Sequence, residues 1–179
     1  MKLVASQLKE GENPFSFSSE SDPWVKDLVS NIAAQGNVIR APLQMALNLT
    51  KLEPDYYLKG RLNFEVEQCC ARCAENFGLK ISHPIELALV HNASGTAGEK
   101  TILSQDTDEL DITYFDGPEI DLAPLMREQF FLSLPYQSVC QEGCLGVCQH
   151  CGKNLNLGKC SCDAQPPSGP FDALKTLKV

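Results

Sequence analysis

Six of the nine cysteines lie within 23 residues near the C-terminus, and this cluster constrains the fold more than any other feature. Its central pair, Cys148 and Cys151, has two residues between the cysteines and is followed directly by Gly152. A tight turn allows two such sulfurs to reach one ion, and glycine supplies the unhindered backbone of that turn. The pattern predicts a zinc knuckle, and Cys70 and Cys73 form a second pair with the same spacing.

Four thiolates complete one tetrahedral zinc site, so eight of the cysteines suffice for two sites. We assign site one to the local group Cys148, Cys151, Cys160 and Cys162. Site two then joins distant pairs, namely Cys70, Cys73, Cys140 and Cys144. An all-local alternative combines Cys140 and Cys144 with Cys148 and Cys151, but it leaves one Cys-x2-Cys pair unused. One or two Zn²⁺ ions are therefore expected, with Cys69 left over as a buried apolar residue. Arg72, Lys153 and Lys159 lie among the ligand pairs, where cations offset the negative thiolates.

The chemistry of these cysteines depends on the cellular compartment. The count of nine is odd, the first residues lack the apolar core of a secretory signal, and no apolar run is long enough to span a membrane. We therefore expect a reducing, cytoplasmic location and no membrane partner. In that setting clustered Cys-x2-Cys pairs indicate zinc rather than disulfides.

The sequence favours a non-catalytic protein. Four thiolates fill every position around a zinc ion, whereas a catalytic zinc keeps one position open. The chain also lacks the Gly-x-Ser-x-Gly, phosphate-loop and His-Glu-x-x-His motifs, and no small-molecule substrate is indicated. The alternative is a cytosolic thiol–disulfide or metal-transfer protein that uses Cys70 and Cys73 as an exposed dithiol. A thioredoxin-like dithiol would precede a helix, but residues 77–82 alternate like a strand.

Hydrophobic periodicity predicts an α+β fold, with an antiparallel sheet or small barrel and two main helices. Apolar residues alternate over 43–49, 62–66, 77–81 and 85–89, and a first strand is expected over 2–8. Asp22 and Pro23 are typical of a helix start, and Asp121 is expected to cap a second helix that Pro135 terminates. We expect a core domain over 1–139, a zinc-knuckle module over 140–162, and a linker with a short amphipathic tail over 163–179.

Acidic residues are concentrated in one stretch. Residues 91–121 contain eight acidic residues and one basic residue, whereas the whole chain has a net charge of −8. The first part of this stretch has the composition of a loop. We therefore expect a solvated and partly mobile segment over 91–121, or a surface for a basic partner.

The order of these motifs resembles the YceD family. The resemblance rests on Cys-x-Arg-Cys, on Ile-Asp-Leu at a helix start, on Cys-Leu-Gly-Val-Cys-x2-Cys-Gly-x-Asn-Leu-Asn, and on the closing Pro-Phe-Asp-Ala-Leu-x-x-Leu. It implies a role in accumulation of 23S ribosomal RNA during assembly of the large ribosomal subunit. The family's bacterial genes commonly adjoin a gene for a large-subunit ribosomal protein. Not every member carries the C-terminal cysteines. Zinc is therefore expected to be a stabilising variation in this protein and not its functional centre.

The residues leave the partner open. RNA-binding proteins usually carry a basic surface, but this chain has a pI near 4.8 and no run of Lys or Arg. Isolated basic residues beside the strands allow local RNA contacts, and the acidic stretch fits a basic ribosomal protein. A zinc ribbon of the transcription apparatus is a third possibility.

Overall fold

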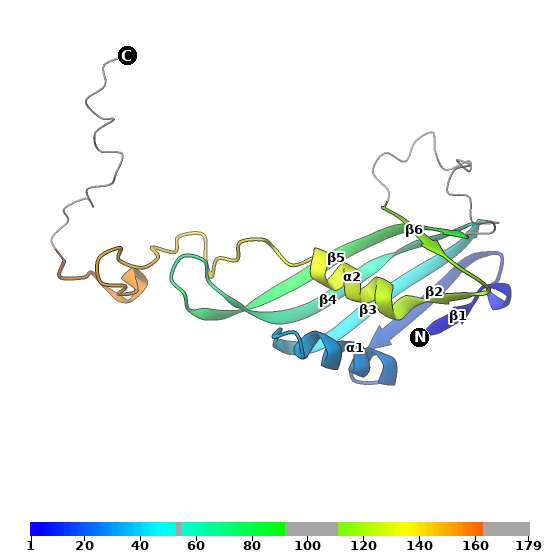
Figure 1. Ribbon diagram of the computed structural model, residues 1–179, viewed down its shortest axis with the longest axis horizontal. Coiled ribbons are helices and arrows are strands. Elements are labelled where there is room, and N and C mark those ends of the chain that lie inside the picture. Colours follow the sequence, from blue (N-terminus) through cyan, green and yellow to red (C-terminus); the bar gives the residue numbers. More distant parts are fainter. Residues whose placement is uncertain (53–54, 92–110, 163–179) are drawn as a thin grey trace, which may run out of the picture.

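A computed structural model describes residues 1–52, 55–91 and 111–162, and it confirms an α+β fold with two helices and a mostly antiparallel sheet (Figure 1). The five-stranded sheet has the order β2-β3-β4-β5-β6. Its strands are β2 (Gly11–Ser18), β3 (Ile39–Leu52), β4 (Asp55–Cys69), β5 (Asn76–His91) and β6 (Asp111–Phe115). The first four strands pair antiparallel with one another, whereas β6 runs parallel to β5. Among the described strands the order is open, so they form a sheet instead of the small barrel that we considered.

Both helices cover one face of this sheet (Figure 1). They are α1 (Pro23–Ala33) and α2 (Leu122–Leu132), and a second small sheet pairs β1 (Lys2–Val4) with β7 (Glu119–Asp121). The predicted alternation explains the packing, because every second residue of a strand faces the helices. Leu43 and Leu49 of β3 and Leu62 of β4 are fully buried there, as are Ile32 of α1 and Phe130 of α2.

Several local predictions need correction. The strand expected over 2–8 ends at Val4 and becomes a 3₁₀ turn over Ala5–Gln7. The alternation expected over 77–81 and continuing through 85–89 is confirmed as one strand, β5, whose pairing with β4 runs from Asn76 to Leu89 without a break. Asp22 does not cap α1 with its side chain, since its carboxylate accepts bonds from the Ser18 amide and the Ser21 hydroxyl.

Helix α2 begins as predicted, because the Asp121 carboxylate accepts a hydrogen bond of 3.1 Å from the Ala123 amide. It ends at Leu132, before Pro135. In the acidic stretch, residues 111–121 form β6 and β7 instead of a continuous loop, whereas residues 92–110 lie outside the described residues. The predicted tail over 163–179 also lies outside them.

The long β4–β5 hairpin positions the cysteines. Its tip extends past the helices, and the chain that leaves α2 returns to this tip before it enters the Cys-rich segment (Figure 1). The Ala71 amide at the tip donates to the Ser138 carbonyl at 2.8 Å, which fixes the returning chain against the hairpin. Segments seventy residues apart in sequence thus meet at one end of the molecule.

Candidate metal centres

The structure places eight cysteines in two groups of four at the hairpin end of the molecule. The first group, which we call the hairpin centre, consists of Cys70, Cys73, Cys140 and Cys144. The second group, the C-terminal centre, consists of Cys148, Cys151, Cys160 and Cys162. Within each group all sulfur atoms lie within 4.8 Å of one another. These are the same groups as in our preferred division, and not those of the all-local alternative.

Sulfur–sulfur distances fit a tetrahedral ion. A zinc–thiolate bond of about 2.3 Å gives sulfur–sulfur edges of about 3.8 Å in a regular tetrahedron. Cys70 and Cys144 have their Sγ atoms 3.8 Å apart, and those of Cys73 and Cys140 are 3.7 Å apart. These distances are far beyond the disulfide bond length of about 2.05 Å. The hairpin centre can therefore hold one ion of this kind. In the C-terminal centre the Sγ atoms of Cys148 and Cys160 are closer, at 3.4 Å, and all four sulfurs lie within 4.8 Å of one another, so metal binding stays a prediction for both groups.

The two Cys-x2-Cys pairs lie in separate turns that have the same backbone geometry. The Cys70 amide donates to the Glu75 carbonyl at 2.9 Å, and the Ala74 amide donates to the Cys70 carbonyl at 2.9 Å. In the C-terminal centre the Cys148 amide bonds the Lys153 carbonyl and the Gly152 amide bonds the Cys148 carbonyl, both at 2.9 Å. Both turns also place the residue after the second cysteine at positive φ, 59° for Ala74 and 71° for Gly152. The knuckle geometry thus occurs twice.

Ala74 is the less suitable residue for this turn. A left-handed backbone brings Cβ close to the following carbonyl, a strain of about 1 kcal/mol that glycine avoids. Ala74→Gly is therefore expected to stabilise the metal-loaded protein by about 0.5 to 1 kcal/mol. The reciprocal Gly152→Ala should destabilise the C-terminal turn by a similar amount. Chemical denaturation and metal competition on both variants test this, and a loss of stability in Ala74→Gly would show that the turn is not strained.

Amide donors surround one sulfur of each knuckle. Cys70 Sγ accepts from the amides of Arg72 and Cys140, both at 3.4 Å. The amide of Cys73, followed by those of Cys140 and Arg72, lowers the pKa of the Cys70 thiol to about 6 against the opposing effect of burial. The amides of Cys151 and His150 likewise lower the pKa of Cys148 to about 6. Hydrogen bonds of this kind stabilise a thiolate, which is the form that binds a metal.

The opposite holds for other cysteines, most strongly for Cys140 and Cys162. The pKa of Cys73 is also raised, because the Glu75 amide, which lowers it, is outweighed by burial and the thiols of Cys70 and Cys144. Burial, followed by the neighbouring thiols, raises the pKa of Cys140 to about 12. The Cys151 side chain, followed by burial, raises the pKa of Cys162 to about 12. Four thiols within a few ångströms cannot all ionise because like charges repel, so a cation is needed for the fully ionised set. This donor set suits a divalent metal ion.

A pH dependence follows from these two cysteines. Because the pKa values of Cys140 and Cys162 lie above neutrality, both thiols are protonated at pH 7 and a metal ion must displace at least one proton per centre. Metal affinity is therefore expected to rise about tenfold or more for each pH unit between roughly pH 6 and 8, and to fall on acidification. Competition with a chromophoric chelator across this range measures the slope. An affinity independent of pH would contradict the assignment of these thiols as ligands.

Asn156 connects the two groups, a role that no sequence motif predicts. It lies in a 3₁₀ turn (Leu155–Leu157) between the ligand pairs of the C-terminal centre, yet its side-chain amide donates to Cys144 Sγ at 3.3 Å. Its carbonyl oxygen accepts from the Leu145 amide at 2.9 Å. The Asn156 amide is the first cause that lowers the pKa of Cys144. The C-terminal centre therefore supports a ligand of the hairpin centre.

Replacing Asn156 with alanine tests this support. The hairpin centre should bind its metal about 10- to 100-fold more weakly, which is the usual effect of removing a hydrogen bond to a ligand. The affinity of the C-terminal centre should change much less, because Asn156 donates to none of its sulfurs. Gln149→Ala, at an exposed position of the same module, is the control. Equal metal affinities of the hairpin centre in the two variants would show that Asn156 does not support this centre.

Basic residues hold the ligand-bearing loops instead of contacting sulfur through their side chains. The Arg72 guanidinium donates to the carbonyls of Glu142 and Cys144, at 3.1 and 3.3 Å. Lys153 Nζ donates to the Lys159 carbonyl at 3.0 Å, which ties together the two halves of the C-terminal centre. Arg72 and Lys153 thus contact backbone carbonyls of the ligand-bearing loops and Lys159 contributes its carbonyl, so the expected offset of thiolate charge stays a prediction.

Two sequence interpretations of single cysteines change. Cys69 is exposed, not the buried apolar residue that we expected, because it lies at the last position of β4 with its neighbour Cys70 turned inward. Cys70 and Cys73 are 2% and 4% exposed. A thiol–disulfide or metal-transfer protein needs an exposed dithiol. The lowered pKa of Cys70 fits that alternative, but the burial of both thiols counts against it.

An open sheet covered by two helices, with two four-cysteine clusters at one end, defines an α+β protein with a candidate double metal centre. The comparisons are more specific. The chain belongs to the YceD family, whose model, described as large ribosomal RNA subunit accumulation protein YceD, matches residues 58–178. The resemblance seen in the motifs is thereby confirmed.

Curated relatives agree with this assignment. The chain is 25% identical over 156 residues to large ribosomal RNA subunit accumulation protein YCED homolog 1, chloroplastic, of Arabidopsis thaliana, covering 76% of this chain and 49% of the relative. The protein of the same name from Zea mays is 26% identical over 151 residues, covering 73% and 52%. The chain thus spans about half the length of the curated relatives it matches. No solved structure gives a significant match. Among the described residues, no helix is long and apolar enough to cross a membrane.

Proposed function

We propose that this protein is a non-catalytic, zinc-stabilised factor in the assembly of the large ribosomal subunit, required in the cytoplasm for accumulation of 23S ribosomal RNA. The observation that carries the proposal is the family match over 58–178, which includes all eight clustered cysteines. The names of the two plant relatives refer to the same process.

The donor sets support a structural role for zinc. Thiolate ligands are typical of zinc sites in reducing compartments, and four thiolates leave no position for water or substrate. The hairpin centre joins the β4–β5 tip to the chain that follows α2, and the C-terminal centre closes the next loop. Zinc in such sites holds distant segments together instead of activating a substrate.

A basic protein is better supported as a partner than RNA. On the outer sheet face, Arg40 pairs with Glu67 at 2.5 Å and Lys59 pairs with Glu86 at 3.0 Å, whereas Arg61 donates to the Ser82 hydroxyl at 3.2 Å. Lys51, on the other face of β3, pairs with Glu10 at 2.6 Å. Cations that already have acidic partners contribute little to binding phosphates. With a net charge of −8, the chain is suited to a positively charged ribosomal protein.

Depletion of the protein in its own cells tests the function. We expect the ratio of 23S to 16S ribosomal RNA to fall and large-subunit precursors to accumulate, with recovery on expression of the intact chain. The protein itself should co-sediment with those precursors. An unchanged RNA ratio, or co-sedimentation with RNA polymerase instead, would overturn the proposal and favour the transcription alternative.

A further inference from the structure

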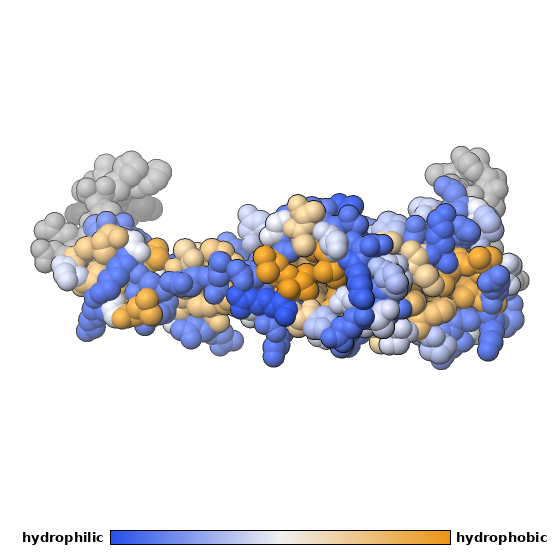
Figure 2. Space-filling view, turned by 90° about the horizontal axis from the view of Figure 1, so that it is seen from below, coloured by the Kyte–Doolittle hydropathy of each residue, from blue (hydrophilic) through white to orange (hydrophobic). Residues whose placement is uncertain are grey.

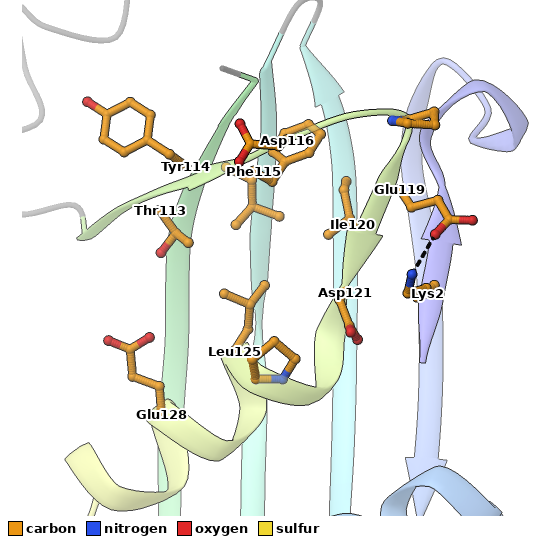
Figure 3. Close-up of a pocket in the computed structure, with 13 residues that line it drawn as sticks. Lys2, Thr113, Tyr114, Phe115, Asp116, Glu119, Ile120, Asp121, Leu125 and Glu128 are labelled. Carbon is orange, nitrogen blue, oxygen red and sulfur yellow. Dashed lines mark ion pairs between the residues drawn. The ribbon is translucent and has the colours of Figure 1, made fainter. Parts of the chain in front are cut away.

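A cavity of about 540 Å³ lies at the end of the fold opposite the cysteine clusters (Figure 3). Its walls come from β6, from the chain between β6 and β7, and from the first turns of α2. In Figure 3, Leu125 and Ile120 form the apolar interior, while Asp116 and Glu128 lie on either side of Thr113. Figure 2 shows hydrophobic areas bordered by hydrophilic residues on the face of the molecule that is seen from below. The cavity thus combines an apolar interior with an acidic rim.

The walls of this cavity are held by hydrogen bonds. His91 Nε2 and the Gly117 carbonyl are 3.1 Å apart, and the Ala5 amide donates to the Pro118 carbonyl at 2.8 Å. Phe115 packs edge-on against Tyr56, with ring centroids 5.8 Å apart. Because β7 is also paired with β1, the segment between β6 and α2 is fixed at both ends. The cavity is therefore preformed, as ligand sites usually are.

The charges around the cavity are one-sided. Four lining residues are acidic, Asp116, Glu119, Asp121 and Glu128, whereas Lys2 is the basic residue among them. Lys2 is already paired with Glu119 at 3.0 Å (Figure 3). Asp116 and Glu128 form no ion pair with any described residue. An occupant with positive charge would neutralise these two carboxylates, and a nucleic acid would be repelled by them.

The adjacent strand favours a polypeptide over a small cation. Among the described strands, β6 has β5 as its single neighbour in the sheet, so its other edge has no described partner, and Thr113, Tyr114 and Phe115 of this strand line the cavity. An extended peptide can follow such an edge while its side chains enter a neighbouring pocket. We propose that this cavity binds an extended segment of a basic protein, with an apolar side chain inside and Lys or Arg side chains at Asp116 and Glu128. The proposal rests on the proposed function and deepens it, since it locates the contact with a basic ribosomal protein.

An array of overlapping peptides from the large-subunit ribosomal proteins tests this site with the intact, metal-loaded protein. The cavity variant is Asp116→Asn/Glu128→Gln, and its matched control is Glu20→Gln/Asp27→Asn, which changes the net charge equally at exposed positions elsewhere. We expect peptides that combine basic and apolar residues to bind. In solution the strongest should bind about tenfold more weakly to the cavity variant, and nearly normally to the control.

A second pair of variants tests the cavity without changing charge. Thr113→Tyr should fill the cavity and reduce peptide binding, whereas Ile112→Tyr, on the opposite and exposed side of β6, should not. Absence of any binding peptide, or equal losses in variant and control, would overturn the proposal. Preferential binding of ribosomal RNA fragments, or of a peptide with the sequence of residues 163–179, would also overturn it. None of these outcomes alters the RNA ratio on depletion, so the two proposals fail separately.

Discussion

Replacing Cys148 with serine is expected to release one metal ion per chain and to unfold the loop over residues 145–162. Cys148 is a predicted ligand whose sulfur lies 3.4 Å from that of Cys160. Within this loop the structure describes only one short 3₁₀ turn, Leu155–Leu157, so little regular structure holds it in place. Structural zinc in small modules contributes about 10–16 kcal/mol of apparent binding free energy at neutral pH, so its loss cannot be offset by the few remaining hydrogen bonds. Elemental analysis and limited proteolysis measure the two effects.

Cys69→Ser is the matched control for this variant. It removes an exposed thiol that belongs to neither centre, so metal content and protease resistance should stay normal. In Cys148→Ser the hairpin centre should keep its ion with reduced affinity, because unfolding of the loop displaces Asn156 from Cys144. Two retained ions and a protected loop in Cys148→Ser would show that the C-terminal cysteines do not bind metal.

The local part of the site could be read directly from the sequence, whereas its long-range part was reached only by elimination among the cysteine pairs. The spacing of Cys148, Cys151 and Gly152 reflects a turn closed within a few residues, and the structure shows that turn. Cys70 and Cys140, by contrast, were grouped only because each pair needed another pair. Their approach depends on the length of the β4–β5 hairpin and on the path of the chain after α2. The role of Asn156 depends on the same long-range contact between the two segments, so no local sequence motif predicts it.

In the fold, strands with strong alternation were predicted and weak ones were missed. β3 and β4 place a leucine, methionine or aromatic residue at nearly every second position, so their alternation is clear. β2 has Phe15 and Phe17 as its main apolar residues and includes Pro14, a residue expected on an edge strand. β6 and β7 are short and lie in an acidic stretch, where composition suggested a loop. Their pairing partners, β5 and β1, provide the stability that their sequences do not show.

The hairpin centre is separate from the main core of the protein. Cys70, Cys73 and Cys144 form a small buried cluster with Phe77 and Val139, whereas the main core lies between the helices and the sheet. Residues after α2 reach the hairpin tip through few contacts, among them the bonds from Ala71 to Ser138 and from Arg72 to Glu142. Two separate clusters can lose their structure independently.

Cys73→Ser is therefore expected to remove the ion of the hairpin centre and to detach residues 136–147 from the hairpin tip, while the sheet and helices stay folded. Hydrogen exchange should accelerate at the tip and over 136–147, and far-UV circular dichroism should keep most of its intensity. The buried Cys73 sulfur lies 3.7 Å from that of Cys140. A serine hydroxyl binds zinc more weakly than a thiolate, so the substitution removes a ligand that joins the two segments. Cys69→Ser, four residues away on the exposed side, is again the control and should leave exchange unchanged. Global unfolding of Cys73→Ser would mean that the metal stabilises the whole fold, and an unchanged exchange pattern would mean that hydrogen bonds alone hold the segment in place.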